Sequence, residues 1–450
     1  MALEIQADRR KFLQASALAG MSYWVTGSLQ AAESKSSLEK VQVACVGVGG
    51  KGQSDVKNVS RHGKIFALCD VDERFLKGMA KVYKTDHTFA DYRDMLDQLG
   101  DRIDAVTIST PDHCHAVIAA KAMNMGKHVH CQKPLTRTIW EARRLGEIAR
   151  EKGVATQMGN QYTAFNPMRK AAAQIKAGQV GTVKEVHVWT DRPIWPQGER
   201  RPMIAQPPKS LAWDLWLGPA PFRPYGEGAY HQFAWRGWWD FGTGALGDMA
   251  CHTCNLPFMA LNMRDPMSVE AECPEHDGDS YPNRSKIKFE FPELAGRAPF
   301  TLYWYDGGNI PSADLFAGVT LKTKDDNGKE IPPPHKSGCM IVGDQAKLYA
   351  AGDYADLGTQ IIGDVKELDP EYPVSPGHEK EWFIAIEDSK KPAMSNFPDY
   401  AGPLVETILL GNLANWKRGR VEWDPKNLKP LNDPTLERIV HCEYRDGYQV

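Results

Sequence analysis

The chain has 450 residues, more than one hydrophobic core usually supports, so two packed domains are expected. Its composition, with 42% hydrophobic and 25% charged residues, is that of an ordinary soluble globular protein. A net charge of -3 provides no basic field for nucleic acid, and beyond residue 32 no segment has the length of a membrane helix. A small-molecule partner is therefore expected.

Residues 1–32 differ in composition and pattern from the rest of the chain. The paired arginines Arg9 and Arg10 precede a mildly apolar stretch at 15–25, and small residues follow. This layout is typical of a twin-arginine export signal and predicts a periplasmic or exported protein. The alternative is a disordered or amphipathic arm on a cytoplasmic protein.

From residue 41 to residue 158, short β-rich runs alternate with helical patterns, which indicates a parallel sheet wound with helices. Thr138 and Glu141 form a capping box before an apolar helix face, so a helix is predicted there. We expect an α/β Rossmann domain over 38–158. The predicted strands are 41–46, 64–69, 105–109, 127–131 and 154–158.

Residues 159–450 are expected to form a second, α+β domain with a large, mostly antiparallel sheet. Segment 192–239 is rich in Pro, Gly, Trp and Tyr with little periodicity, which is typical of a long functional loop. The closing helices, within 379–416, could pack back on the first domain. The predicted strands are 183–189, 285–291, 300–305 and 339–349, and the predicted helices are 166–178, 379–389 and 403–416.

The strongest local motif is the glycine run at 47–52, which fits GxGxxG and follows a β-rich run. Such glycines permit a tight turn, a close approach of backbone to a pyrophosphate, and close packing of helix on strand. Asp70 lies 18 residues beyond Gly52, where a carboxylate can bind ribose hydroxyls and repel a 2′-phosphate. We therefore predict NAD, although glycines serving only a tight turn are the alternative. The predicted contacts in the run are Gly47, Gly49, Gly50, Lys51 and Gly52.

Two further strand ends, at 110–116 and 128–134, are expected to reach the same cleft. Lys133 matters most, because a sheltered lysine can donate to a substrate hydroxyl and stabilise a developing alkoxide. An ordinary solvated surface lysine is the alternative. The predicted cofactor contacts at these strand ends are Thr110, Pro111, His115, Gln132 and Lys133.

Histidines and cysteines cluster at 113–115, 128–131 and 251–254, so a metal site must be considered. Cys251 and Cys254 make only one CxxC, whereas structural zinc normally needs two such pairs or a matching pair of histidines. We therefore predict no metal site. The chain has 9 cysteines, and we expect most of them to be reduced and buried.

These motifs together resemble the Gfo/Idh/MocA family of oxidoreductases. The resemblance rests on the glycine run, Asp70, TPDHCH, CQKPLT, GNQ at 159–161 and GTGALGDMACH at 242–252. It implies a Rossmann domain joined to an open-faced antiparallel sheet, and activity on sugars, inositols and related polyols. It also implies a homodimer or homotetramer paired through that sheet. The family's EKP tripeptide corresponds here to Gln132, Lys133 and Pro134, so the acid has become an amide.

The resemblance also implies that the family's second-domain aspartate and histidine correspond to Asp248 and His252. Residues four apart share one helix face, so both could reach the cleft. Histidine suits proton transfer near neutrality, and Asp248 could orient its ring. A capping carboxylate and a core histidine are the alternative. The predicted substrate contacts are Asn160, Gln161, Tyr162, Trp238 and His252, with aromatic residues at 225–241 serving as a sugar platform or as core.

We therefore expect an NAD-dependent oxidoreductase acting on a hydroxyl of a carbohydrate, glycoside or polyol. Lys133, His252 and Asp248 are the predicted catalytic residues. Because a periplasmic enzyme lacks a supply of soluble NAD, the cofactor would stay bound through each cycle. The alternatives are a glycoside hydrolase that oxidises and re-reduces its substrate, and a catalytically silent sugar or cofactor sensor.

Overall fold

The computed structural model describes residues 40–324 and 327–450, so the predicted export signal at 1–32 lies outside it. Residues Val41–Val450 form one compact unit. Within the described residues, every helix is too short or too polar to cross a membrane.

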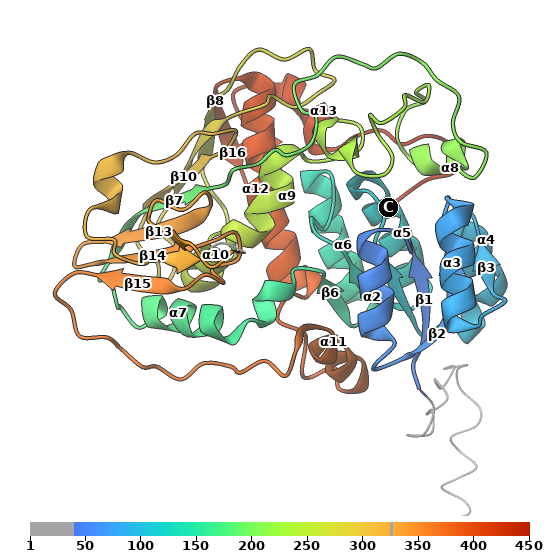
Figure 1. The fold of residues 1–450 in the computed structure, drawn as a ribbon, viewed down its shortest axis with the longest axis horizontal. Helices are drawn as coiled ribbons and strands as arrows, with labels where there is room; N and C mark the ends of the chain where they lie inside the picture. The colour runs from blue at the N-terminus through green and yellow to red at the C-terminus, as the bar shows by residue number, and fades with distance from the viewer. Residues whose placement is uncertain (1–39, 325–326) are drawn as a thin grey trace, which may run out of the picture. The chain divides into compact units, whose positions relative to one another are not determined.

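The first domain is a six-stranded parallel sheet of order β3-β2-β1-β4-β5-β6 (Figure 1). The strand order reverses between β1 and β4, and ligands in such sheets bind at this point, beyond the carboxyl ends of the strands. The strands are β1 (Gln42–Val46), β2 (Lys64–Cys69), β3 (Thr88–Phe89), β4 (Ala105–Ile108), β5 (His128–Cys131) and β6 (Thr156–Met158). The helices are α2 (Lys51–Val59), α3 (Glu73–Tyr83), α4 (Tyr92–Leu99), α5 (Asp112–Asn124) and α6 (Ile139–Lys152).

All five predicted strands of this domain are present, and only the two-residue β3 lacked a sequence signal. The predicted capping box begins α6: the Glu141 amide donates to Thr138 Oγ1, and the Thr138 amide donates to Glu141 Oε2 at 2.9 Å. Gly153, with φ 63°, ends the helix in the left-handed conformation that glycine adopts without strain.

The second domain contains a nine-stranded, mostly antiparallel sheet of order β15-β14-β13-β7-β10-β9-β8-β16-β17. Only β7 and β10 run parallel to each other. The strands are β7 (Val183–Trp189), β8 (Ser268–Glu272), β9 (Lys286–Phe291), β10 (Phe300–Tyr305), β13 (Gly338–Gly343), β14 (Lys347–Ala351), β15 (Thr359–Ile362), β16 (Arg420–Asp424) and β17 (Lys429–Pro430). A separate pair, β11 (Thr323–Lys324) and β12 (Glu330–Ile331), forms a small antiparallel ribbon.

One predicted strand, 339–349, is wrong, because it is a hairpin of β13 and β14. The turn is tight: the Gly343 amide donates to the Ala346 carbonyl at 3.0 Å. Both strands are largely buried, and the glycine and polar residues between them, Gly343, Asp344 and Gln345, are the turn signal that the strand prediction passed over.

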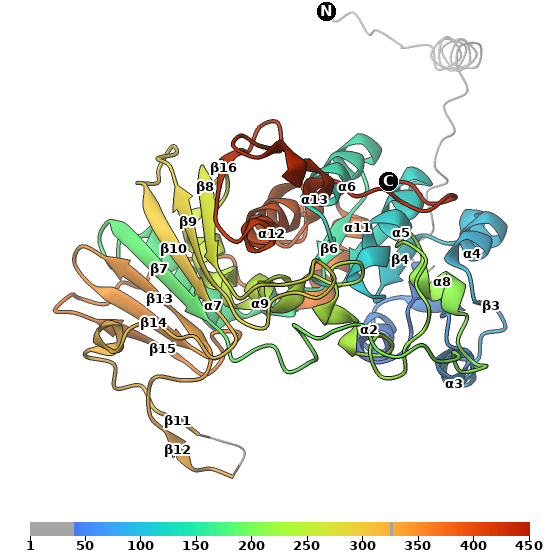
Figure 2. The same ribbon diagram turned by 90° about the horizontal axis from the view of Figure 1, so that it is seen from above.

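Helices cover one face of this sheet (Figure 2). Buried and half-exposed side chains alternate along β9 and β10, so the other face of these strands is half-exposed. The central helix is α12 (Gly402–Lys417), which contacts β8, β9 and β16 on one side and α6 of the first domain on another. Twelve of its 16 residues are buried, as expected of a helix that is apolar all round. The other helices are α7 (Asn166–Lys176), α9 (Gly244–Thr253), α10 (Asn255–Leu261) and α11 (His378–Glu387).

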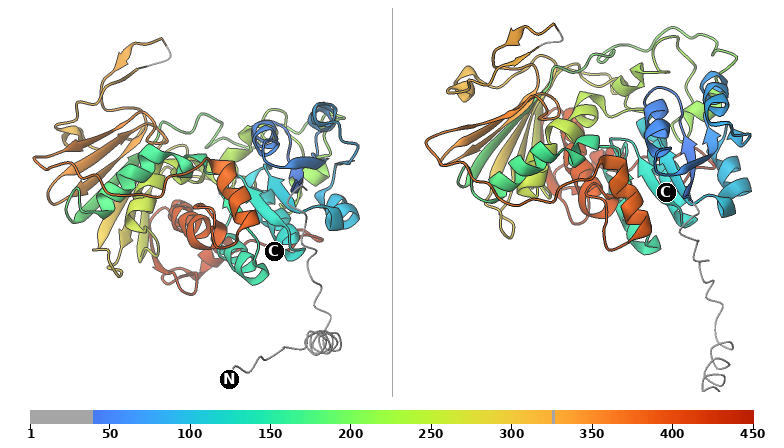
Figure 3. Two further views of the ribbon diagram at one scale, coloured as in Figure 1. Left: turned by 90° about the horizontal axis from the view of Figure 1, so that it is seen from below. Right: turned by 60° about the horizontal axis from the view of Figure 1, so that its bottom comes forward.

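Helices α11 and α12 lie against the first domain (Figures 1 and 3). Trp382 of α11 donates its indole N–H to the Ala155 carbonyl at 3.3 Å. Glu406 of α12 pairs with Arg143 of α6 at 2.7 Å. Buried apolar side chains of both domains also form one continuous cluster.

Segment 192–239 is mostly irregular and contains one short helix, α8 (Trp213–Leu217). Its predicted aromatic platform is wrong for Tyr230 and Trp238, which are 1% exposed and pack with Trp216 and Phe241 in a small core of their own. The Trp238 indole N–H donates to the Ala229 carbonyl at 2.8 Å and has no further hydrogen to offer a ligand. Aromatic rings in one segment bury one another when they can, which composition alone does not reveal.

The cysteine prediction is confirmed. All nine cysteines are free thiols, seven of them buried and two, Cys273 and Cys442, half-buried.

Candidate active site

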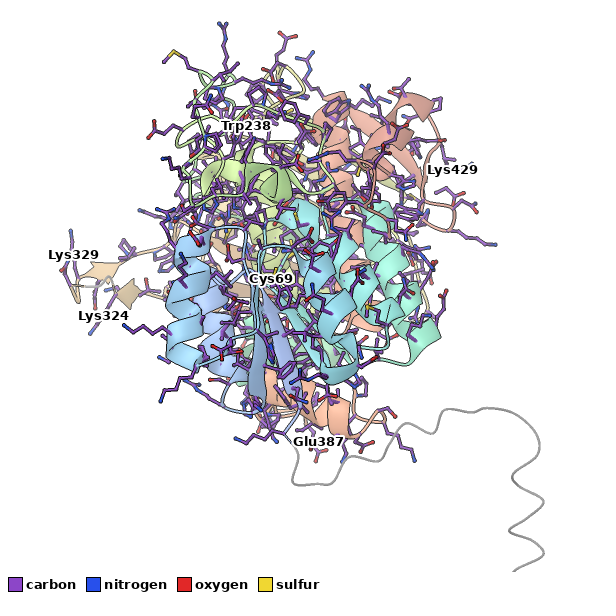
Figure 4. All side chains as sticks on the ribbon, turned by 90° about the vertical axis from the view of Figure 1, so that its right-hand side faces the viewer. Cys69, Trp238, Lys324, Lys329, Glu387 and Lys429 are labelled. Carbon is purple, nitrogen blue, oxygen red and sulfur yellow. The ribbon has the colours of Figure 1, made fainter. Side chains whose placement is uncertain are left out.

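A cavity of about 550 Å³ opens beyond the carboxyl ends of β1, β2, β4 and β5. Its wall combines the glycine turn and strand ends of the first domain with α9 and part of segment 192–239 from the second. This volume is within the range of small-molecule and cofactor sites. Cys69, the last residue of β2, lies in the middle of the view in Figure 4, directly before Asp70.

The glycine turn leaves no room for side chains at two positions. Gly47 has φ 77°, and a Cβ there would lie 2.7 Å from the Ser109 backbone. A Cβ at Gly52 would lie 2.0 Å from the Gly47 carbonyl oxygen, so Gly52 lets α2 pack on the strand rather than facing the cavity. Gly50, at φ 50° and with open space around its Cβ position, faces the cavity at the start of α2. This turn and helix N-terminus fit a pyrophosphate.

Asp70 ties the glycine turn to the end of β2. Its Oδ2 accepts from the amides of Val48 at 2.7 Å and Gly49 at 3.1 Å, and its Oδ1 accepts from the Asp72 amide. Burial raises the pKa of Asp70, although these three amide donors oppose the rise. The carboxylate therefore fixes the turn as well as facing the cavity, where ribose hydroxyls are expected.

Lys133 reaches across the cavity from the end of β5 to α9. Its Nζ donates to both the carbonyl oxygen and Oδ1 of Asp248, each at 2.9 Å. An ammonium has three N–H donors, so one is left for a ligand in the cavity.

Asp248 is held by two cations. Besides Lys133 it accepts from Arg236 Nε at 3.0 Å. Burial alone would raise the pKa of Asp248, but these cations outweigh burial and hold it well below its usual range. Sequence reasoning missed Arg236, which stacks on Trp235 and lies in a segment without periodicity.

His252 is held by Asn160, not by Asp248, which corrects the predicted orienting pair. His252 Nδ1 lies 3.0 Å from Asn160 Oδ1, while the amide nitrogen of Asn160 donates to the Cys251 carbonyl. Both Asp248 and His252 do face the cavity, as their spacing predicted, but the oxygens of Asp248 bind Lys133 and Arg236. An ion pair across two domains cannot be inferred from helical spacing.

The Asn160 contact determines the tautomer of His252. Because an amide oxygen only accepts, Nδ1 carries the proton and Nε2 has a lone pair. No group among residues 40–324 and 327–450 hydrogen-bonds to Nε2. Burial lowers the pKa of His252 well below its usual value, so the ring is neutral near pH 7.

Tyr354, which follows β14, also lines the cavity and was not predicted. Its ring meets His252 edge-on at 4.7 Å and stacks on Tyr162 at 4.3 Å. Tyr162 therefore lies behind Tyr354 and outside the cavity wall. No local pattern marks Tyr354, because it lies in a loop far along the chain.

Gln132 donates its amide to Oδ2 of Asp55 on α2 at 2.9 Å. Asp55 is 2% exposed and also accepts from Ser109 Oγ at 2.7 Å and from Lys51 Nζ. The acid that the resemblance implies at position 132 is thus replaced by an amide, which binds the buried carboxylate of Asp55 on α2.

His115 braces the cavity wall from behind. Its ring nitrogens contact the carbonyl oxygens of Pro134 and Thr110, both at 2.8 Å, and burial lowers its pKa to about 4. It therefore joins two strand-end loops instead of facing a ligand.

The predicted site residues divide into two groups. Those in the cavity wall are Gly47, Gly49, Gly50, Lys51, Asp70, Thr110, Pro111, Gln132, Lys133, Gln161, Asp248 and His252. Those outside the wall are Gly52, His115, Asn160, Tyr162 and Trp238. The second group supports the wall or, for Trp238, the separate aromatic core, and Figure 4 shows Trp238 well away from Cys69.

Asp112, at the start of α5, is a further titratable group in the wall. It is 2% exposed and accepts from Thr243 Oγ1 at 2.8 Å. Burial raises its pKa to about 7, so this carboxyl exchanges its proton near neutrality. Within the described part of the chain, no three His, Cys, Asp and Glu side chains gather as metal ligands would.

Two family models match the chain. One, described as an oxidoreductase family with an NAD-binding Rossmann fold, matches residues 41–160. The other, the C-terminal alpha/beta domain of the same oxidoreductase family, matches residues 176–295.

Curated relatives are similar over part of their length. Levoglucosan dehydrogenase of Pseudarthrobacter phenanthrenivorans is 25% identical over 177 residues, 39% of this chain and 37% of the relative. A glycosyl hydrolase family 109 protein of Solibacter usitatus is 30% identical over 195 residues, 39% of this chain and 44% of the relative. The chain thus matches less than half the length of these curated relatives.

Solved structures share the fold. The WlbA dehydrogenase of Bordetella pertussis, in complex with NADH and UDP-GlcNAcA, superposes with a TM-score of 0.59 at 15% identity. The match covers 86% of this chain and 99% of that one. With both domain models matched in order and both sheets present, the chain belongs to the Gfo/Idh/MocA family of oxidoreductases.

Proposed function

We propose that this protein is an NAD-dependent oxidoreductase that acts on a hydroxyl of a carbohydrate, glycoside or polyol. The observation that carries the proposal is the meeting of Lys133 Nζ and His252 in the wall of one cavity with the glycine turn. One domain supplies the dinucleotide turn and the other supplies the proton acceptor, so the reacting carbon is placed between them.

The glycine turn would hold the pyrophosphate of NAD, and Asp70 would meet the adenosine ribose. The negative charge of Asp70 disfavours a 2′-phosphate, which supports NAD over NADP. When bound, the nicotinamide supplies a hydride acceptor for the carbon that carries the substrate hydroxyl.

The chain's own residues would handle the hydroxyl proton. The remaining N–H of Lys133 donates to the substrate oxygen and stabilises the negative charge that develops there. His252 accepts the proton at Nε2, because Asn160 keeps the other ring nitrogen protonated. Asp248 pairs with both Lys133 and Arg236 and offsets part of their positive charge in a buried site.

Gln161 and Tyr354 are two of the wall residues that suit sugar contacts, and Gln232, Trp195 and Trp235 line the same wall. An amide can donate to and accept from hydroxyls, and an aromatic ring can pack against the apolar face of a sugar ring. The substrate contacts predicted for Asn160, Tyr162 and Trp238 are replaced by supporting roles.

We further propose that NAD stays bound through turnover. Segment 192–239 is attached to the residues that follow β2: the Glu73 amide donates to the Ser210 carbonyl and the Ala212 amide donates to the Val71 carbonyl, each at 2.9 Å. His231, which lines the cavity, contacts the buried carboxylate of Asp72 at 3.2 Å. These contacts support a covered cofactor that leaves slowly.

Export and assembly are proposed on separate grounds. Arg9 and Arg10 support twin-arginine export, and replacing both with lysine should trap the protein in the cytoplasm.

The half-exposed sheet face, where His187 stacks on Tyr303 at 4.9 Å, supports pairing of subunits. Light scattering of wild type and Tyr303→Asp tests that pairing, and an unchanged mass would remove this face as the contact.

The test of the reaction is Lys133→Ala. We expect turnover to fall by at least about a hundredfold, since a charged donor to the developing alkoxide is lost, while NAD retention changes little. Lys51→Ala, at the glycine turn, is the matched control and should affect the retention of NAD more than turnover. Unchanged turnover in Lys133→Ala would show that Lys133 is not a catalytic residue.

A second candidate is an NAD-dependent glycoside hydrolase, favoured by the family 109 relative and by Asp112. On this route a ring hydroxyl is oxidised, a proton leaves the neighbouring carbon, the aglycone is eliminated, water adds, and the same hydride returns. The route needs a second proton acceptor, and a wall carboxyl with a pKa of about 7 suits that role.

Aryl glycosides separate the two candidates. Release of aglycone without net NADH supports hydrolysis, whereas NADH or an oxidised sugar supports the dehydrogenase. Absence of any turnover over a broad panel of sugars supports the silent sensor.

A further inference from the structure

The cavity that contains the reactive residues continues past Asp70 to the end of β3. Asp91 and Tyr92, which follow β3, line it, and the Asp70 amide donates to the Phe89 carbonyl at 3.1 Å, so the two strand ends are side by side. The glycine turn would hold the pyrophosphate of NAD and Asp70 the ribose. Adenine is attached to that ribose, so it falls in this part of the cavity.

This part of the cavity, called here the adenine slot, is mainly apolar. Val117 and Ile118 follow Cys114 by one turn of α5, so the three side chains share one face of that helix. A Cβ at Gly218 would lie 2.8 Å from Cys114 Sγ, so the chain that leaves α8 packs directly on α5. A flat aromatic base gains free energy by entering such an apolar space. The slot is lined by Tyr92, Cys114, Val117, Ile118, Gly218 and Tyr448.

Tyr448 belongs to residues 441–450, called here the tail segment, which follow the short helix α13 (Glu437–Val440). The tail segment first runs along α6: the His441 ring stacks on Trp140 at 3.9 Å, and Tyr444 Oη donates to Glu141 Oε1 at 2.8 Å. The chain then ends beside α5 (Figures 1 and 2). These residues lie outside both matched family models, so their course is a property of this chain.

The tail segment is also attached to segment 192–239. The Arg445 amide donates to the Pro219 carbonyl at 3.0 Å, and Arg445 Nη2 pairs with Asp214 Oδ1 on α8 at 2.6 Å. The tail segment therefore connects α6 of the first domain with α8, and α8 leads into Gly218 in the wall of the slot.

The ring of Tyr448 is held at the start of α4. The guanidinium of Arg93 lies over this ring, 4.6 Å from its centroid, and Arg93 Nη2 pairs with Asp91 Oδ2 at 2.6 Å. Tyr448 is half-buried and lines the slot. Its side chain is thus fixed from the first domain, while its backbone is fixed through Arg445.

We propose that Tyr448 contacts the adenine ring of NAD and that the tail segment closes this end of the cavity. The inference rests on the binding of NAD in the reaction cavity. Nucleic-acid bases pack favourably on aromatic side chains, and Tyr448 offers such a ring in the slot where adenine falls. The tail segment would be a second cover beside segment 192–239, and NAD leaves only after this cover opens.

The first test compares the two halves of NAD, which AMP and nicotinamide mononucleotide carry separately. The full-length protein, freed of bound nucleotide, is titrated with each. Tyr448→Ala should weaken the binding of AMP by about fivefold or more, the contribution of one aromatic ring to the binding of a base, and should leave nicotinamide mononucleotide unchanged. Tyr448→Phe should retain AMP binding. Gln449→Ala, an exposed neighbour in the tail segment, is the matched control.

The second test opens the tail segment without changing Tyr448. Arg445→Asp places two carboxylates together at Asp214, and we expect NADH to leave about threefold faster, since an exposed ion pair contributes little. Asp214→Arg in the same chain restores an ion pair and should restore the wild-type rate. A displacement assay on the NADH-loaded protein gives these rates.

The outcomes separate this inference from the proposed function. A wild-type protein that binds neither AMP nor NAD would overturn both. Normal binding of NAD, with AMP bound equally well by wild type and Tyr448→Ala, would overturn the role of Tyr448 alone. An equal loss of AMP and nicotinamide mononucleotide in Tyr448→Ala would do the same, because the substitution would then disturb the whole cavity instead of the adenine slot.

Discussion

Nδ1 of His252 lies 3.0 Å from Oδ1 of Asn160, and this contact leaves Nε2 of the ring as the proton acceptor in the cavity. Asn160 is itself fully buried and fixed by its bond to the Cys251 carbonyl. The orientation of the proposed base thus depends on an amide of the first domain's last strand end rather than on the carboxylate four residues before it.

Asn160→Ala should therefore impair proton transfer, although Asn160 itself does not contact the substrate. We expect kcat to fall by about tenfold to a hundredfold, part of what a positioned base contributes. Leaving Nδ1 unpaired should also cost about 1–3 kcal/mol of unfolding free energy. Steady-state kinetics and urea unfolding check both values, with Asn166→Ala as the control, because Asn166 hydrogen-bonds to the backbone of Ser375 instead. Equal kcat in the two variants would contradict this role.

Asp55 and Gln132 should behave as a coupled pair. Gln132→Glu would place a second carboxylate beside Asp55, and we expect the repulsion to lower stability by about 1–3 kcal/mol. Asp55→Asn in the same chain should restore most of that loss. A double-mutant cycle measured by urea unfolding checks the coupling, and simple additivity of the two changes would show that the amide and the carboxylate do not act together.

Asp112 should make stability depend on pH. Its folded pKa of about 7 lies above the usual aspartate pKa of 3.8, so its contribution to stability is full below pH 3.8 and is lost as pH rises through about 7. Compared with wild type, Asp112→Asn should gain stability by up to roughly 1.4 kcal/mol per pH unit across that window. Denaturant unfolding of both proteins at three pH values tests this, and a difference that does not change with pH would contradict it.

His231 should slow the release of NAD. Removing its contact with the buried carboxylate of Asp72 in His231→Ala should speed release by about tenfold to a hundredfold, the loss of one hydrogen bond to a charged group. Phe222→Ala is the matched control in the same segment, because that side chain is 74% exposed. Displacement of bound nucleotide by an excess of a fluorescent analogue gives the release rates. Identical rates in both variants would show that the His231–Asp72 contact does not help to retain the cofactor.

The parts of the site that were predictable are those encoded by short, ordered patterns. The glycine turn, Lys133 after β5, and the Asp248–His252 spacing each place a side chain through the geometry of one strand end or one helix. These residues face the cavity as expected.

The remaining parts depend on packing between distant segments. Arg236, Tyr354 and Asp55 come from a loop, a strand-end loop and a helix whose meeting no local pattern encodes. Trp238 was misassigned for the same reason, since composition does not tell whether aromatic rings bury one another or face a ligand.

We propose above that the cofactor stays within the protein. The most direct measurement is to purify the full-length protein without added nucleotide, denature it, and identify and quantify what is released. We expect close to one NAD or NADH per chain, with the redox state shifting when substrate is added before denaturation. A protein that releases no nucleotide and fails to bind added NAD or NADH would contradict this proposal.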